Sequence, residues 1–139
     1  MRIRNVLISC MIAVTICSVA CDARAEDTKQ TPLDSLLGKY EGKLTYVRTR
    51  THEQDFRTEI VSVDAAANTV SLVNYCLDCE DIREWKRNNC RITDVQKTIK
   101  FICKGKYADE EYTYTEGRLR ATGVGKKYPY SISVTKVVK

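Results

Sequence analysis

The segment CRITDVQKTIKFIC, residues Cys90 to Cys103, decides the fold that we expect for this chain. Two stretches that alternate between apolar and polar residues flank the pair Gln96-Lys97, a pattern typical of a β-hairpin. Pairing them about that midpoint places Cys90 opposite Cys103 and predicts a disulfide between the strands. Since side chains alternate along a strand, one face gathers the apolar residues Cys90, Ile92, Ile99, Phe101 and Cys103. The cysteines and the apolar pattern therefore select the same register.

The turns of two expected hairpins are specified to different degrees. Gln-Lys is not a favoured two-residue turn, so a wider four-residue loop that keeps the pairing is an alternative for the first hairpin. Glu116-Gly117, between two further alternating stretches, is a good two-residue turn. Its register places Tyr112 opposite Ala121 and Tyr114 opposite Leu119.

The rest of the chain reads as short strands without a long helix. Strands are expected over 38–48, 56–63, 69–75, 82–87 and 130–138, besides those of the two hairpins. Residues 49–54 are expected to be a polar loop that carries His52, and Asn88-Asn89 to be a turn. Consecutive hairpins predict an all-β, antiparallel up-and-down meander of about eight or nine strands that closes into a small barrel and so removes exposed edges. A two-sheet sandwich is the alternative.

Residues 1–25 are expected to be a secretory signal peptide. Arg2 and Arg4 precede an apolar run over 6–20, and Ala23-Arg24-Ala25 supplies the small residues of a cleavage site. The alternative is a lipoprotein that is acylated at Cys21 and anchored in the cell envelope. We expect a periplasmic or secreted protein, with membrane contact only if it is lipidated.

The mature chain is expected to have a flexible N-terminal lead-in over 26–37 and a β-barrel domain over 38–139. Within the lead-in, Leu33, Leu36 and Leu37 are expected to form one apolar turn that plugs an end of the barrel. Removing residues 1–25 takes Lys+Arg from 23 to 20 and Asp+Glu from 18 to 17, which leaves a net charge of +3. This small excess does not indicate nucleic-acid binding.

Four of the seven cysteines remain after residue 25: Cys76, Cys79, Cys90 and Cys103. An even number in an exported domain predicts two disulfides. The favoured pairing joins Cys76 to Cys79 and Cys90 to Cys103, and the alternative joins each of the first two to the hairpin. A redox role for Cys76-x-x-Cys79 is disfavoured because the acidic neighbours would raise a thiol pKa. The spacing lacks the second paired knuckle of zinc ribbons, so no metal and no cofactor are expected.

The motif Leu36-Leu37-Gly38-Lys39-Tyr40-Glu41-Gly42, ahead of a strand meander, resembles the start of lipocalin-like, calycin-type small barrels. The opening motif of that family is Gly-x-Trp, and Tyr40 takes the place of the tryptophan. The family's arginine that closes the barrel base has no assigned position in this chain. The resemblance implies a cup for an apolar ligand or a partner, although a domain this short is also compatible with an interior filled by side chains.

The aromatic residues are the candidate ligand-pocket residues. Tyrosines outnumber phenylalanines eight to two, and a tyrosine ring joins an apolar body to a hydrogen-bonding tip, which suits an amphipathic ligand. The alternative is that they fill the core. The candidates are Tyr40, Tyr46, Tyr112, Tyr114, Trp85 and Phe101.

No catalytic residue is expected, because His52 is the only histidine and no nucleophile accompanies it. The acidic run Asp109-Glu110-Glu111 is interpreted as a solvated turn, and Arg87 as part of a basic surface. We therefore expect a binding protein rather than an enzyme: a lipocalin-like carrier or sensor of a small amphipathic ligand. The alternative is a protein-binding module such as an inhibitor of a cell-wall hydrolase, of the lysozyme-inhibitor type.

Overall fold

A computed structural model of the chain describes residues 31–80, 83–106, 108–125 and 128–138. The expected signal peptide, the lipidation site at Cys21, the cleavage site after Ala25 and the start of the expected strand at Ile82 lie outside these residues. No helix within the described ranges is both long enough and apolar enough to cross a membrane.

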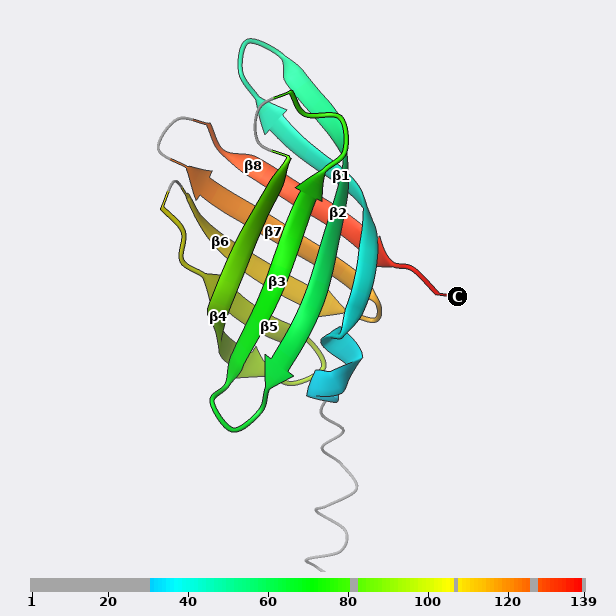
Figure 1. The fold of residues 1–139 in the computed structure, drawn as a ribbon, viewed down its shortest axis with the longest axis vertical. Helices are drawn as coiled ribbons and strands as arrows, with labels where there is room; N and C mark the ends of the chain where they lie inside the picture. Colours follow the sequence, from blue (N-terminus) through cyan, green and yellow to red (C-terminus); the bar gives the residue numbers. More distant parts are fainter. Residues whose placement is uncertain (1–30, 81–82, 107, 126–127, 139) are drawn as a thin grey trace, which may run out of the picture. The chain divides into compact units, whose positions relative to one another are not determined.

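Eight antiparallel strands follow one short 3-10 helix in the described residues, and they pair in chain order until β8 pairs with β1 (Figure 1). The elements are η1 (Leu33–Leu36), β1 (Gly38–Val47), β2 (Thr51–Asp64), β3 (Thr69–Cys76), β4 (Glu84–Val95), β5 (Ile99–Cys103), β6 (Ala108–Thr115), β7 (Arg118–Gly125) and β8 (Tyr130–Lys136). The predicted all-β meander and its closure into a barrel are confirmed, and the sandwich alternative is not.

The hairpin of β4 and β5 contains the predicted Cys90–Cys103 disulfide, with the two Cα atoms 4.3 Å apart. Ile92 pairs with Phe101 as expected, but Val95 pairs with Ile99, because the register shifts by one residue between Ile92 and Asp94. The connection is therefore three residues long, rather than the two or four expected. The shift leaves one extra residue on β4 and one more in the connection, so the hairpin does not need a two-residue Gln-Lys turn.

The second hairpin follows the prediction. Tyr112 pairs with Ala121 and Tyr114 with Leu119. Both turn residues have positive φ, 47° at Glu116 and 79° at Gly117, as a two-residue hairpin turn requires.

Two expected loop segments are strand instead. Residues 51–54 belong to β2 and pair with β1, and within the described residues they have no partner on β3, which begins to pair with β2 at Phe56. Opposite them, β1 also pairs with β8 as far as Tyr46, and beyond that residue the tip of the β1–β2 hairpin extends past the barrel wall as an arm (Figure 1). Because residues 51–54 lack a second neighbouring strand, they need no apolar face, and their sequence looks like a polar loop. Asn88-Asn89 lies inside β4, where two residues oppose Ser71 alone in a β-bulge with Asn89 at φ +55°.

The 3-10 helix η1 closes one end of the barrel. Leu36 is fully buried, as expected, whereas Leu37 is 38% exposed and takes no part in the plug. The Tyr40 hydroxyl donates to the carbonyl of Leu36 at 2.6 Å, and Lys136 Nζ donates to the carbonyl of Ser35 at 2.6 Å. Lys136 also lies 5.8 Å from the centre of the Tyr40 ring, within the range of a cation–π contact.

The barrel domain begins before Gly38. The backbone N–H of Thr31 donates to the carbonyl of Gln96 at 2.9 Å, and its hydroxyl donates to that of Lys97 at 2.8 Å. Residues from Thr31 onward form one compact unit with the strands. The expectation of a flexible lead-in that reaches residue 37 is therefore wrong for 31–37, since the turn that buries Leu36 needs these residues in place.

We expect Gly42→Ala to destabilise the barrel by about 1–3 kcal/mol, because small-to-large changes force a packed structure to shift. A Cβ at this position would lie 2.1 Å from the carbonyl oxygen of Ser133 and 2.8 Å from the Cα of Val134, both backbone atoms of β8. The free energy of unfolding in denaturant measures the loss. Thr45→Ala, on the outward face of β1, is the control and should change it by less than about 0.5 kcal/mol. Equal losses would contradict close packing at this seam.

Candidate functional site

A carboxylate lies inside the barrel at the end opposite η1, here called the distal end. Glu110 is fully buried, and four side-chain donors surround its two oxygens. Oε1 accepts from Trp85 Nε1 at 3.1 Å and from the Tyr130 hydroxyl at 2.7 Å. Oε2 accepts from Arg87 Nε at 3.1 Å and from the Tyr112 hydroxyl at 3.0 Å. These five residues form the Glu110 cluster.

The cluster combines side chains from three strands that begin at the distal end. Trp85 and Arg87 come from β4, Glu110 and Tyr112 from β6, and Tyr130 from β8. On β4, strict alternation from Arg87 would turn Cys90 outward, yet Arg87 contacts the buried carboxylate and Cys90 is buried in the core. The bulge at Asn88-Asn89 switches the alternation, so that one strand supplies both the cluster and the disulfide.

Two glycines make room for the cluster. A Cβ on Gly123 would lie 2.1 Å from Cζ of Tyr130, the residue that it pairs with on β8. A Cβ on Gly105, before β6, would lie 2.7 Å from Cζ of Arg87 and 2.4 Å from the carbonyl oxygen of Ala108. Any larger residue at either place would displace a side chain that bonds Glu110.

A hydrogen-bonded chain connects the cluster to the opposite wall of the barrel. Asn74 Nδ2 donates to the Tyr112 hydroxyl at 2.8 Å, and the Thr58 hydroxyl donates to Asn74 Oδ1 at 2.7 Å. All three side chains are buried. No buried side-chain nitrogen or oxygen of the described residues lacks a partner, and a fully satisfied network of this kind rigidifies a core.

The electrostatics of the cluster favour a charged Arg87 and neutral tyrosines. Burial by itself would lower the pKa of Arg87, but the charge of Glu110 and the hydrogen bond to it raise that pKa above its usual value. Burial, and then the charge of Glu110, raise the pKa of Tyr112 and of Tyr130. At the other end, burial and then the neighbouring Tyr114 raise the pKa of Tyr40.

We expect the stability of the barrel to fall steeply above about pH 10, the ordinary tyrosine pKa. The folded-state pKa values of Tyr40, Tyr112 and Tyr130 lie above the unfolded value, so the native state holds protons that the unfolded chain releases. Their contribution is complete below pH 10 and is lost as the pH rises further. Tyrosinate absorbance, recorded together with circular dichroism, should show these residues ionising only as the barrel unfolds.

Tyr112→Phe combined with Tyr130→Phe is the matched variant, and its stability should depend less on alkaline pH than that of the native chain. If every tyrosine of the native chain ionised near pH 10 while the barrel stayed folded, the burial of these hydroxyls would be contradicted.

The predicted pocket residues lie in two groups. Tyr40, Phe101, Tyr112 and Tyr114 are buried in the core. There, Phe101 stacks on Tyr112 with ring centres 4.8 Å apart, and Tyr40 meets Tyr114 edge-on at 6.3 Å. Without rearrangement a ligand reaches none of these four, and their role as pocket residues stays a prediction.

The other two candidates are half-buried and lie toward the distal end. Trp85 belongs to the Glu110 cluster and lies 5.4 Å from the ring of Phe56. Tyr46 pairs with Tyr130 across β1 and β8, and it stacks on His52 with ring centres 4.9 Å apart. The structure therefore brings Tyr46 and Trp85 toward the same end, and separates them from Tyr40.

Three cluster members were missed by reasoning from the sequence. Glu110 was interpreted as part of a solvated turn and Arg87 as part of a basic surface; both interpretations are wrong. Tyr130 was expected to face inward, and this is confirmed. Its hydrogen bond to Glu110 was not expected. The signal for Glu110 was its spacing, because it shares the inward face of its strand with Tyr112 and Tyr114.

The second disulfide joins Cys76 to Cys79, with Cα atoms 5.5 Å apart, and this is the favoured one of the two pairings. Within the described part of the chain, no three His, Cys, Asp or Glu residues are grouped so that they could hold a metal ion. Two disulfides indicate that the domain matures in an oxidising compartment, extracellular or periplasmic.

No family model, curated protein or solved structure matches this chain. The architecture, a closed antiparallel barrel of eight strands, is compatible with the lipocalin-like resemblance of the 36–42 motif. A cation also lies at the closed end, where Lys136 of the last strand covers the Tyr40 ring.

Proposed function

We propose that the chain is an exported binding protein, not an enzyme, and that it holds a small amphipathic ligand at the distal end of the barrel. One observation carries the proposal. Trp85 and Tyr130 are half-buried, and the polar tips of both rings are bonded to Glu110. What these rings offer to a ligand is therefore carbon, which makes an apolar surface beside a charged group.

The ligand site is shallow in this proposal. The interior beneath it is filled by side chains such as Phe56 and Tyr112, so the apolar part of a ligand would rest on Trp85 and Tyr130 instead of entering the barrel. Arg87 supports the polar part, since a guanidinium has five N–H donors and Glu110 accepts the one on Nε. Ligands with a negatively charged or carbonyl-bearing head are favoured.

Binding is favoured over catalysis by the state of the carboxylate. A general base needs a free lone pair within reach of the proton that it removes. The lone-pair sites of Glu110, about four in all, each face a donor of the chain itself. The histidine, His52, is stacked on Tyr46.

The fluorescence of Trp85 tests the proposal, because it is the one tryptophan of the chain. The probe is anilinonaphthalene sulfonate, an amphipathic anion. We expect saturable quenching of Trp85 emission with energy transfer to one bound probe per chain. Tyr130→Ala should weaken binding, whereas Tyr75→Ala, which changes a half-buried tyrosine on the outward face of β3, should not. Unchanged Trp85 emission, or equal weakening by both variants, would overturn the proposal. Native mass spectrometry of protein from its own host then identifies the natural ligand by its mass.

A second candidate function, binding of a protein partner, is favoured by the arm of β1 and β2. The arm extends past the barrel wall, its tip residues Arg48, Thr49 and Arg50 are exposed, and Val47 is 53% exposed. Such an arm suits insertion into a cleft, as an inhibitor of a cell-wall hydrolase would do. A pull-down should then recover one stoichiometric protein from the native chain and lose it with Val47→Asp. If this substitution left the recovery unchanged, the arm would be excluded as the surface that binds the partner.

A further inference from the structure

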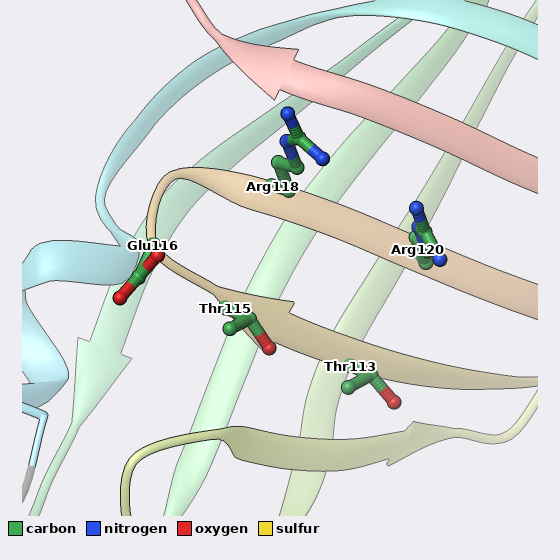
Figure 2. A pocket seen from close by; sticks show the side chains of 5 residues that line it. All are labelled: Thr113, Thr115, Glu116, Arg118 and Arg120. Atoms are coloured by element: carbon green, nitrogen blue, oxygen red, sulfur yellow. The ribbon is translucent and has the colours of Figure 1, made fainter.

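A hollow lies on the outer face of β6 and β7, away from the Glu110 cluster (Figure 2). It encloses about 530 Å³ and is lined by Thr113, Thr115, Glu116, Arg118 and Arg120. These side chains face outward because the residues that alternate with them, Tyr112, Tyr114, Leu119 and Ala121, are buried. The hollow is therefore independent of the barrel interior and of the proposed ligand site.

The two arginines of the hollow have no partner in the described part of the chain. Its five ion pairs use other residues, and neither Arg118 nor Arg120 forms a side-chain hydrogen bond. Arg118 and Arg120 are two residues apart on one strand, so their Cα atoms are about 7 Å apart. Lys100, exposed on β5, is likewise unpaired. Asp94, which pairs with Lys100 across β4 and β5, and Glu116 of the hollow are the acidic neighbours on this face. Neither forms an ion pair with the three cations, so the face keeps a small excess of positive charge for a partner.

Hydroxyl groups alternate with these cations across the sheet. Lys100 pairs with Thr113, Thr113 with Arg120, and Arg120 with Ser133. In the next row, Thr115 pairs with Arg118 and Arg118 with Thr135. Because neighbouring strands are about 4.8 Å apart, cations two strands apart are separated by about 10 Å with a hydroxyl between them.

We propose that this face binds an acidic polysaccharide, a sugar chain that carries carboxylate groups. A guanidinium matches a carboxylate with two parallel N–H···O bonds, and Arg118 and Arg120 offer two such forks along one strand. The hydroxyls of Thr113, Thr115, Ser133 and Thr135 both donate and accept, as sugar hydroxyls require. The partner is bound along the wall of the barrel, while the distal end stays open.

Other partners fit this face less well. A lipid surface is recognised by clusters of about four to eight Lys or Arg, and the described face has three. The core of a protein interface is enriched in aromatic residues, and single-stranded nucleic acid stacks on them. The rows 98–100, 113–120 and 131–135 carry no outward aromatic side chain among the described residues.

Calorimetric titration with polygalacturonate oligosaccharides tests the proposal, with uncharged dextran as the control ligand. We expect the native chain to bind the polyuronate and not dextran, with affinity that falls as salt is added. Arg118→Ala combined with Arg120→Ala should weaken binding about tenfold or more, because charge-assisted hydrogen bonds are lost. Both side chains face solvent, so this double variant should unfold at the same denaturant concentration as the native chain.

Lys39→Ala combined with Lys86→Ala is the matched variant, since it removes the same charge from exposed positions on β1 and β4. It should keep the native affinity. Equal weakening by both double variants would overturn the proposal, because net charge alone would then explain binding. So would an absence of polyuronate binding, or arginine-dependent binding to anionic phospholipid vesicles in its place. The Trp85 emission should stay unchanged throughout, so failure here leaves the proposed ligand site unaffected.

Discussion

Glu110→Gln is expected to lower the free energy of unfolding by about 3–5 kcal/mol, the range for breaking a buried ion pair. The substitution keeps the size of the side chain but leaves Arg87 charged in the barrel without an ionic partner. The new amide nitrogen takes the place of one carboxylate oxygen, and there it meets a group that can only donate: Trp85 Nε1 at the Oε1 position or Arg87 Nε at the Oε2 position. Unfolding in denaturant, followed by Trp85 fluorescence and by circular dichroism, measures the loss.

Glu111→Gln is the control, because this neighbouring carboxylate is exposed on the opposite face of β6. It should change the free energy of unfolding by less than about 0.5 kcal/mol. Similar losses for the two variants would show that burial of Glu110 contributes little.

The double variant Glu110→Leu with Arg87→Met separates charge from hydrogen bonding. It removes both charges together, and apolar replacement of a whole buried ion pair is often close to neutral. We expect it to be more stable than Glu110→Gln. If it were equally unstable, the abandoned donors of Trp85, Tyr112 and Tyr130 would account for the loss instead of the charge of Arg87.

Removing the Cys90–Cys103 disulfide by two alanine substitutions is expected to cost about 3 kcal/mol, and removing Cys76–Cys79 about 2 kcal/mol. A crosslink stabilises mainly by restricting the unfolded chain, and it does so more when it closes a longer loop. The separations are 13 residues for the first pair and 3 for the second. Cys90 and Cys103 are also buried in the core, so their loss leaves unfilled space.

Each double alanine variant serves as the control for the other, with denaturant unfolding at a fixed temperature as the measurement. A larger loss from the Cys76–Cys79 pair would contradict the expectation that the disulfide closing the longer loop contributes more. Intact mass with thiol alkylation should show four reactive sites after reduction and none before it.

The fold could be predicted from local sequence patterns. The register of the hairpin at Glu116-Gly117 was predictable because alternation and a two-residue turn specify the same pairing. The Cys90–Cys103 crosslink was predictable for a similar reason. The strand at residues 51–54 was not, since these four residues are all polar and leave no apolar periodicity.

The candidate site was predictable only in part. Trp85 and Tyr112 were among the expected pocket residues, but the reason for grouping them was their aromatic character and not the carboxylate that they share. Asn88-Asn89 was interpreted as a turn, a kind of structure in which asparagine is common because it tolerates positive φ. In the barrel the same tolerance makes a bulge, because β3 continues alongside both halves of β4.

By itself, the sequence determined the class of fold and the order of the strands, and it favoured the observed pairing of the cysteines over its alternative, because each depends on residues close together in the chain or on strict alternation. Only the tertiary structure decided that Glu110 is buried. A carboxylate enters a core only when donors surround it, and here they come from β4, β6 and β8, as far as 25 residues away on β4. These donors come into contact with Glu110 only when the barrel closes, so no local sequence pattern predicts the contacts.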